Sequence, residues 1–273
     1  MRERIVAWLV DCGLPGWIVP DYWFMLTTAI VVGALISRAA SRRSKLDAPA
    51  SDLLFFGILG LFLGAKVLYG LQYWSSWSWS RLYQPSGFAL YGGLLGVLTV
   101  WLLIDLIRPF PIWGFLDCVA PGLALGLFFG RIGCFLAGCD GGIASGWPWA
   151  VAFPPGTTSY NDQLIHGYIS ADAQLSLPAH PTQLYESAFG LVAFFLLWRL
   201  LASRRWEGEV FLTGIIWYAA YRFPSEWLRV SGGYRPLGIF TFAQFVSLVL
   251  LAGAIFGYYW RSRGRARRVE AVG

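Results

Sequence analysis

The sequence predicts an all-α, polytopic membrane protein with about seven transmembrane helices. Of its 273 residues, 57% are hydrophobic and only 13% are charged, and its mean hydropathy is +0.56. A water-soluble domain carries roughly 25% charged residues. The long apolar stretches lack the alternating polar residues of an outer-membrane barrel. The composition also excludes a disordered chain, a coiled coil and a disulfide-stapled secreted domain.

Seven stretches are apolar enough to cross a hydrocarbon core about 30 Å thick, which takes roughly 20 residues each. They lie near residues 22–38, 52–74, 88–107, 112–130, 182–200, 208–224 and 239–260. We expect one transmembrane domain over residues 1–273, without internal repeats or a separate soluble domain. The apolar run in the first ten residues is too short for a signal peptide, so residues 1–20 are expected to form an interfacial segment.

Lysine and arginine divide unevenly between the two sides of these spans. Most of the 21 such residues fall on the side that holds the C-terminus. The positive-inside rule then places the N-terminus outside and the C-terminus in the cytoplasm. Residues 138–180 become a periplasmic loop region, and residues 261–273 a basic cytoplasmic tail. The net charge of +6 is therefore explained by topology and anionic lipid rather than by nucleic acid.

Aromatic residues fit this orientation. Amphipathic rings prefer the boundary between lipid and water. Five tryptophans would lie at the outer interface: Trp74, Trp77, Trp79, Trp147 and Trp149.

The span near residues 112–130 carries a glycine at every fourth position, at Gly122, Gly126 and Gly130. This spacing is typical of a helix face that lets a neighbouring helix approach closely. Arg131 ends that face at the outer boundary. A single arginine there is explained by interfacial snorkelling, whereas its planar fork of donors also suits a phosphate.

More polar residues follow the sixth span. Tyr218, Arg222 and Glu226 are spaced by four residues, which places them on one helical face. Pro224 predicts that the helix bends or ends nearby. An Arg222–Glu226 pair fits either a structural or a functional role, and Arg229 follows closely. Several cations thus gather at the outer leaflet, and we expect a pocket for a lipid phosphate that opens to the bilayer and to the outside.

Two further polar positions need an explanation. Lys66 lies in the outer half of the second span, where an isolated charge costs about 2.5–3.5 kcal/mol, so a partner or an aqueous cavity is expected. Pro181 suits a first helical position, which puts His180 near the cap and Gln183 one turn in. His180 fits a cap or an interfacial residue, and it could also titrate near neutrality as a base. His166 is isolated in sequence, so no metal site is expected.

The four cysteines do not define a disulfide framework. Cys118 lies within a predicted span, whereas Cys12, Cys134 and Cys139 fall near the outer face. The spacing of Cys134 and Cys139 allows a bridge but does not establish one.

Several sequence blocks resemble those of the prolipoprotein diacylglyceryl transferases, in the same order. They are GAKVLYG (64–70), FALYGGLLG (88–96), LDCVAPGLALG (116–126), GRIGCFLAGCDGG (130–142), HPTQLYES (180–187) and YRFPSEWLR (221–229). The fourth block is similar to the family signature, which usually reads Arg-Ile-Gly-Asn-Phe followed by Gly-Glu and a further glycine. The similarity covers nearly the whole chain after the first span.

The resemblance implies transfer of a diacylglyceryl group from phosphatidylglycerol to the lipobox cysteine of a prolipoprotein. A thioether forms and glycerol 1-phosphate leaves. The protein would be a multi-pass protein of the bacterial plasma (inner) membrane, with its active site on the periplasmic side. Guanidinium groups would stabilise the departing phosphate, and a positive site would favour ionisation of the attacking thiol. No metal and no other cofactor is implied.

The resemblance also implies roles for individual residues. Arg131 and Arg222 would hold the phosphate or ester region of the lipid, and Glu226 would orient Arg222. Tyr91 stands where a histidine often precedes the Gly-Gly pair, and we expect it to donate a hydrogen bond rather than to abstract a proton. Lys66 replaces an arginine, and two cysteines replace the asparagine and glutamate of the signature. The expected substrate-binding residues are Arg131, Lys66, Tyr69, Gly92, Gly93, Cys134, Cys139, Asp140, Gly142, His180, Gln183, Tyr218 and Arg229.

Two alternative functions remain on the sequence alone. The first is a related transferase that uses the same lipid pocket but another thiol or hydroxyl acceptor. The second is a transporter or a lipid-binding membrane protein. Transporters usually have paired repeats and helices broken near the midplane. This sequence has no apparent repeat and gathers its charges at one face, which weighs against transport.

Overall fold

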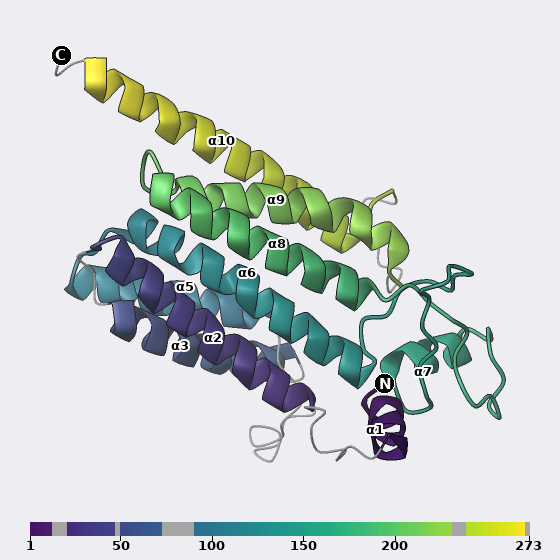
Figure 1. The fold of residues 1–273 in the computed structure, drawn as a ribbon. Helices are drawn as coiled ribbons and strands as arrows, with labels where there is room; N and C mark the ends of the chain where they lie inside the picture. The colour runs from purple at the N-terminus through teal and green to yellow at the C-terminus, as the bar shows by residue number, and fades with distance from the viewer. Residues whose placement is uncertain (13–20, 47–49, 73–89, 231–238, 271–273) are drawn as a thin grey trace. The chain divides into compact units, whose positions relative to one another are not determined.

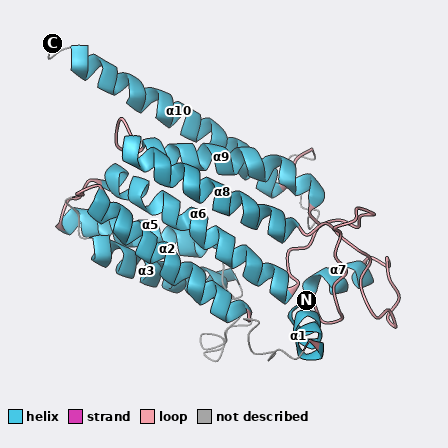
Figure 2. Cartoon of the chain, in the orientation of Figure 1, coloured by secondary structure: helices cyan, strands magenta, loops and turns pink. Residues whose placement is uncertain are grey.

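The structure, a computed structural model, describes residues 1–12, 21–46, 50–72, 90–230 and 239–270, and its regular secondary structure there is helical. Figures 1 and 2 show the helices. They are α1 (Arg2–Asp11), α2 (Tyr22–Arg43), α3 (Ala50–Gln72), α5 (Leu90–Ile107), α6 (Ile112–Ala137), α7 (Thr158–Ile165), α8 (Thr182–Ser203), α9 (Glu209–Ser225), the 3₁₀ helix η3 (Glu226–Leu228) and α10 (Phe242–Glu270). Within these ranges the β structure is limited to isolated bridges. The predicted all-α class is confirmed.

Five of these helices are long and apolar enough to cross a membrane: α2, α3, α6, α8 and α10. Two other predicted spans coincide with shorter helices. The apolar part of α5 covers Gly92–Ile107, and α9 has 17 residues. The described residues therefore support five spans by length and composition. The predicted count of seven and the predicted sidedness of the termini are not confirmed. Trp74, Trp77 and Trp79 lie outside the described residues.

The chain forms two compact units. The larger unit combines Met1–Ala40 with Leu116–Gly273, and the smaller unit is Ser41–Phe115. The smaller unit is built on the close approach of α3 and α5. A Cβ atom added at Gly96 would lie 2.0 Å from the carbonyl oxygen of Gly60, and one added at Gly92 would lie 2.3 Å from that of Gly64. Only glycines permit such a backbone-to-backbone contact.

In the larger unit, α6, α8, α9 and α10 run side by side (Figure 1). Helix α2 packs against α6 through the predicted glycine face. A Cβ atom at Gly122 would lie 2.4 Å from the carbonyl oxygen of Gly33, and one at Gly126 would lie 3.3 Å from that of Ala29. A Cβ atom added at Gly130 would have no neighbour within 4 Å, and Gly133 packs against α2 instead. Each step of four residues turns an α-helix about 40° past a full turn, so the third glycine of the repeat leaves the contact face.

A buried carboxylate ties one end of this helical layer together. Asp117 of α6 is fully buried and accepts hydrogen bonds from the backbone N–H groups of Gly208 (2.7 Å) and Phe211 (2.9 Å). It also pairs with Arg204, at 3.1 Å. Asp117 therefore satisfies N–H groups that the first turn of α9 leaves free.

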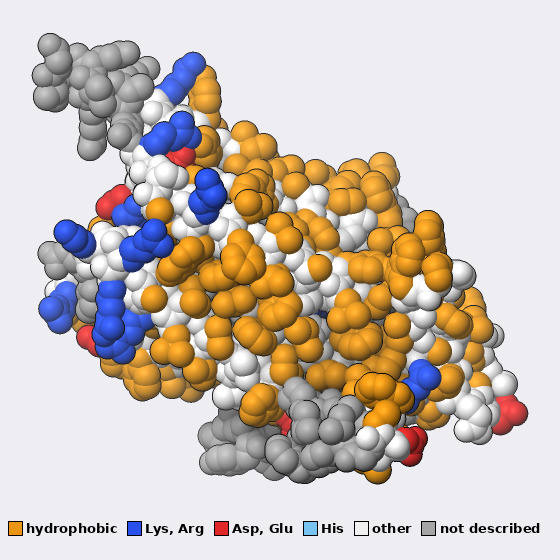
Figure 3. Space-filling model, viewed as in Figure 1, with side chains coloured by type: hydrophobic (Ala, Val, Ile, Leu, Met, Phe, Trp, Pro, Cys, Tyr) orange, Lys and Arg blue, Asp and Glu red, His pale blue; other side chains and the backbone are white. Residues whose placement is uncertain are grey.

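Basic residues lie at this same end of the larger unit. Arg205 donates to Tyr258 of α10 at 2.9 Å, and Arg261 donates to the carbonyl oxygen of Glu207 at 3.1 Å. The predicted basic tail continues as helix α10 through Glu270. In Figure 3, Lys and Arg side chains gather near this end, whereas hydrophobic side chains cover most of the neighbouring helical surface. Phe195 of α8 and Phe256 of α10 are examples of exposed hydrophobic side chains, which are expected on helices in lipid.

At the opposite end of α8, residues 138–180 fold into loops around the short helix α7. Backbone hydrogen bonds between Val151 and Ala179 hold the loops together. Helix α1 packs at this end: Ile5 and Val6 contact the cluster of Met25 and Leu136.

Candidate functional site

A buried carboxylate lies at the centre of the polar cluster in the larger unit. Glu186 is one turn inside α8, and its side chain is only 2% exposed. Arg131, near the end of α6, binds it at two points. The Nε–Oε2 distance is 3.0 Å, and the Nη2–Oε1 distance is 3.2 Å. A two-point pair of this kind fixes the plane of the guanidinium as well as its position.

A second arginine and a second carboxylate complete the cluster. Arg229 follows η3, and its two terminal nitrogens contact Glu186 at 3.4 Å and Asp140 at 3.1 Å. Asp140 also pairs with Arg131 at 3.1 Å. The formal charges of these four side chains sum to zero. Each arginine therefore contacts both carboxylates, and each carboxylate contacts both arginines.

The turn after α6 delivers Asp140 to this cluster. Gly138 adopts a φ of +73°, and its N–H group donates to the carbonyl oxygen of Phe135. The N–H group of Cys139 donates to the carbonyl oxygen of Cys134, and both distances are 3.1 Å. These two bonds define a Schellman motif, which ends the helix and reverses the chain. Asp140 also has a positive φ, of +57°, which aspartate tolerates better than most residues.

The first turn of α8 holds the same loop. The hydroxyl of Thr182 donates to the carbonyl oxygen of Asp140 at 3.0 Å, and the amide of Gln183 donates to that of Cys139 at 2.6 Å. Gln183 is fully buried. Its amide group therefore fixes the loop backbone, which is a positioning role.

Gly142 joins the loop to both flanking segments. Its N–H group donates to the carbonyl oxygen of His180 at 3.0 Å, and it forms an antiparallel bridge with Arg229. A Cβ atom at this position would lie 2.6 Å from the carbonyl oxygens of both His180 and Leu228. Only glycine leaves room for this pairing, which brings Arg229 toward Asp140.

Arg222 belongs to a neighbouring chain of polar contacts. It pairs with Glu226 one turn later, and Glu226 accepts a hydrogen bond from the hydroxyl of Thr241 at 3.1 Å. Thr241 and Gln244 form a reciprocal capping box at the start of α10, with bonds of 3.1 and 3.3 Å. Glu226 is thus held from two sides. Pro224 lies in the last turn of α9, which ends at Ser225, as its position in the sequence predicts.

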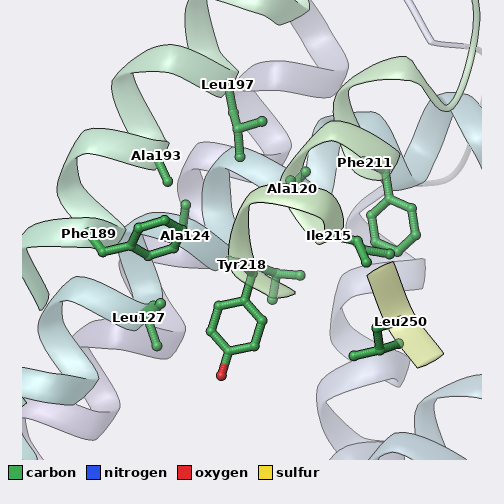
Figure 4. A pocket seen from close by; sticks show the side chains of 12 residues that line it. Ala120, Ala124, Leu127, Phe189, Ala193, Leu197, Phe211, Ile215, Tyr218 and Leu250 are labelled. Carbon is green, nitrogen blue, oxygen red and sulfur yellow. The ribbon is translucent and has the colours of Figure 1, made fainter. Parts of the chain in front are cut away.

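Tyr218 connects the ion cluster to an apolar cavity. Its hydroxyl donates to Glu186 at 3.4 Å. Its ring lines a cavity of about 270 Å³ between α6, α8, α9 and α10, shown in Figure 4. The other lining residues include Ala124, Leu127, Phe189, Ala193 and Ile215. This volume is close to the lower end of ligand pockets, roughly 300–1,000 Å³.

Comparison with known proteins identifies the family of this chain. The family model described as prolipoprotein diacylglyceryl transferase matches residues 13–260. The chain belongs to the prolipoprotein diacylglyceryl transferase family.

Three relatives named phosphatidylglycerol–prolipoprotein diacylglyceryl transferase illustrate the similarity. The Xanthomonas oryzae protein is 36% identical over 216 residues, which covers 74% of this chain and 72% of the relative. The Psychrobacter arcticus protein is 32% identical over 267 residues, which is 88% of each chain. The Bordetella avium protein is 31% identical over 225 residues, which covers 80% of this chain and 79% of the relative. The similarity therefore extends over most of both chains.

The His180 side chain of this transferase-family protein contacts Tyr185. Its Nδ1 atom lies 3.1 Å from the hydroxyl oxygen of Tyr185, which also accepts a hydrogen bond from the indole of Trp149 at 2.7 Å. Pro181 is the N-cap of α8 rather than its first residue, because its ψ of 65° is not helical. The sequence prediction of Pro181 as the first helical residue was therefore wrong by one position.

The two signature-loop cysteines lie side by side as free thiols. The Cys139 sulfur lies 3.6 Å from the carbonyl oxygen of Cys134. Hydrogen bonding with the Cys134 side chain, together with burial, raises the pKa of the Cys139 thiol.

The remaining predicted site residues belong to the smaller unit. Lys66 and Tyr69 lie on α3, and Gly92 and Gly93 lie on α5. Both glycines pack against α3, because added Cβ atoms would come within 3.0 Å of its backbone or side chains. The side chain of Tyr91 lies outside the described part of the chain.

Glu186 was not among the predicted site residues, although it lies at the centre of the cluster. Its neighbours Arg131, Tyr218 and Arg229 were all predicted. A signal was present, because Glu186 falls one turn inside a predicted span, where a charged side chain is costly. A carboxylate there indicates a buried partner.

Proposed function

We propose that this protein transfers the diacylglyceryl group of phosphatidylglycerol to the lipobox cysteine thiol of prolipoproteins. Membership of the family and the names of its relatives support this activity. The observation that carries it is the position of Tyr218, whose ring lines the apolar cavity while its hydroxyl reaches Glu186. Space for hydrocarbon therefore adjoins a set of fixed guanidinium groups, as binding of a phospholipid requires.

The contrast between the apolar cavity and the guanidinium groups orients the lipid. Part of an acyl chain occupies the cavity beside Phe189 and Ala193, and the phosphate lies toward Arg222. Arg131 and Arg229 each contact two carboxylates, whereas the side-chain contacts of Arg222 among the described residues are with Glu226. Arg222 therefore keeps donors for the phosphate. Arg131 positions the signature loop and adds positive potential to the site.

The reaction breaks the bond between a glycerol carbon and a phosphate oxygen, and a carbon–sulfur bond forms. Negative charge grows on the departing glycerol 1-phosphate, and guanidinium groups that are already in place stabilise it without reorganisation. The attacking sulfur must lose its proton, whose pKa in a free cysteine is near 8.5, and the positive site favours the thiolate. Tyr91 donates a hydrogen bond to lipid or peptide in this scheme.

Charge distribution supports a periplasmic site in the inner membrane. The ion cluster lies where α8 begins, and Arg204 and Arg205 lie where α8 ends. The positive-inside rule assigns the basic end to the cytoplasm. Arg4 of α1 donates to the carbonyl oxygen of Ala152 at 2.9 Å, so the N-terminal helix belongs to the outer side with the loops. Helices α5 and α9 then complete seven crossings.

A cell-free assay with labelled phosphatidylglycerol and a lipobox peptide tests this function. We expect a diacylglyceryl thioether on the cysteine. Arg222→Lys should lower the rate by about 10²–10³-fold, as loss of one transition-state donor does. The matched control is Arg199→Lys, an exposed arginine near the other end of α8. An Arg222→Lys protein with the wild-type rate would contradict the role of Arg222, and a product seen only with another acceptor would favour a paralogous transferase.

A further inference from the structure

We propose that Cys134, Cys139 and Asp140 form a binding site for a soft divalent metal ion such as Zn²⁺ or Cd²⁺. The two sulfur atoms and a carboxylate oxygen of Asp140 all lie within 4.8 Å of one another. Ligand atoms around a tetrahedral zinc, with Zn–S bonds near 2.3 Å, are separated by about 3.8 Å. Side-chain rotations that move these atoms by about 1 Å therefore bring all three within bonding distance of one ion.

The Schellman motif explains why the two thiols meet. This motif brings the side chain of the second residue after the helix against the side chain of the third-last helical residue, and that contact is usually hydrophobic. Here Cys139 and Cys134 occupy the two positions, which the backbone bonds of Gly138 and Cys139 define. The thiol pair is thus set by the end of α6 itself.

Helix α8 fixes the loop that carries two of the three ligands. Gln183 holds the carbonyl oxygen of Cys139 at 2.6 Å, and Thr182 holds that of Asp140 at 3.0 Å. Because the backbone is already restrained, metal binding needs to order only side chains. Preorganisation of this kind reduces the entropic cost of binding.

The local charges accommodate a divalent cation. Arg131 and Arg229 are balanced by Asp140 and Glu186. A divalent ion that displaces two thiol protons to solvent leaves this net charge unchanged. Each Asp140 oxygen accepts one arginine contact, so each retains a lone pair for a metal. The Asp140 side chain is 44% exposed, and water can therefore fill the fourth coordination position.

No metal site was predicted from the sequence, because His166 is isolated and no second histidine lies at ligand spacing. The C-x₄-C-D spacing here does not match the usual pairs of ligands on one turn. Only the reversal of the chain after α6 brings these side chains together. Cys12 and Cys118 take no part, since Cys12 ends α1 and Cys118 is buried four turns earlier in α6.

Titration of the full-length protein with Cd²⁺, in detergent and a non-thiol reductant, tests the site. We expect a thiolate-to-metal absorption band that saturates at one equivalent. Cys134→Ser and Cys139→Ser should each lose the band, and Asp140→Asn should weaken Cd²⁺ binding by at least about 10-fold. The matched control, Cys12→Ser with Cys118→Ser, should keep both the band and the affinity.

A second measurement uses the unmodified protein and does not depend on variant folding. Cd²⁺ should protect Cys134 and Cys139 from maleimide labelling, as mapped by mass spectrometry, while Cys12 stays reactive. Three results would overturn the site: no band with stoichiometric Cd²⁺, a band that survives Cys139→Ser, or equal labelling with and without Cd²⁺. Because none of these readouts measures transfer, the site and the transferase activity can fail independently.

Discussion

Arg131 and Glu186 meet in a side-on pair, with both Glu186 oxygens bound to the same guanidinium at 3.0 and 3.2 Å. The pair joins the end of α6 to the start of α8. Because Glu186 also contacts Arg229 and Tyr218, this one carboxylate organises groups from α6, α9 and the segment after η3. Its loss should therefore affect stability and activity together.

Glu186→Gln tests this role. The substitution keeps the shape of the side chain but leaves Arg131 and Arg229 with one carboxylate between them. Breaking a buried ion pair from one side costs about 3–5 kcal/mol. We expect a lower thermal unfolding temperature in detergent and loss of most transferase activity. Glu207→Gln, at an exposed glutamate, is the control, and it should match the wild type in both measurements. A stable, active Glu186→Gln protein would refute the organising role.

Gly142→Ala tests the loop closure. The new methyl group would lie 2.6 Å from two carbonyl oxygens, so the pairing with His180 and Leu228 must open. Overpacking of this kind costs about 1–3 kcal/mol. We expect a reduced unfolding temperature and reduced activity, because the displaced segment carries Arg229 away from Asp140. Gly146→Ala is the matched control in the same loop, since an added Cβ there has no neighbour within 4 Å. Equal effects of the two substitutions would contradict this reasoning.

The sequence predicted contacts that lie within one helix better than contacts between helices. Arg222 lies in the last turn of α9 and Glu226 follows directly after it at the start of η3, four residues later, so their pairing follows from local helical geometry. Arg131 and Glu186 are separated by 55 residues, and no local periodicity relates them. Helical geometry also explains the outcome for the glycine face. The predicted contact of Gly122 with a neighbouring helix is confirmed, whereas that of Gly130 is wrong.

Asp117→Ala tests the opposite end of the larger unit. The substitution leaves the N–H groups of Gly208 and Phe211 without their acceptor and removes the ion pair between Asp117 and Arg204. We expect destabilisation of about 3–5 kcal/mol, measured by unfolding in detergent. The stability of the Asp117→Asn protein should lie between those of the Asp117→Ala protein and the wild type, since an amide oxygen still accepts one of the hydrogen bonds. Asp11→Ala, at an exposed position in α1, should have no measurable effect.

Tyr91→Phe tests the predicted role of this residue in the reaction. A tyrosine hydroxyl has a reference pKa near 10 and is a poor base at neutral pH. If the hydroxyl only donates a hydrogen bond, its removal should leave part of the activity in the lipobox-peptide assay. Tyr69→Phe, at a second tyrosine of the smaller unit, provides a comparison. Complete loss of activity in a Tyr91→Phe protein of wild-type stability would contradict the assignment of a hydrogen-bonding role alone.

The contacts of the Cys139 thiol should determine how its alkylation rate depends on pH. Its pKa is raised by hydrogen bonding with the Cys134 side chain and by burial. A higher pKa means less thiolate at a given pH, so Cys139 should be alkylated more slowly than a free thiol of pKa near 8.5, and its rate should still be rising above that pH. Cys134→Ala removes the first cause and should accelerate alkylation at about pH 8. Peptide mapping by mass spectrometry after timed maleimide labelling measures both rates in a Cys12→Ser background. Alkylation of Cys139 as fast as that of N-acetylcysteine, unchanged by Cys134→Ala, would contradict the contact between the two thiols.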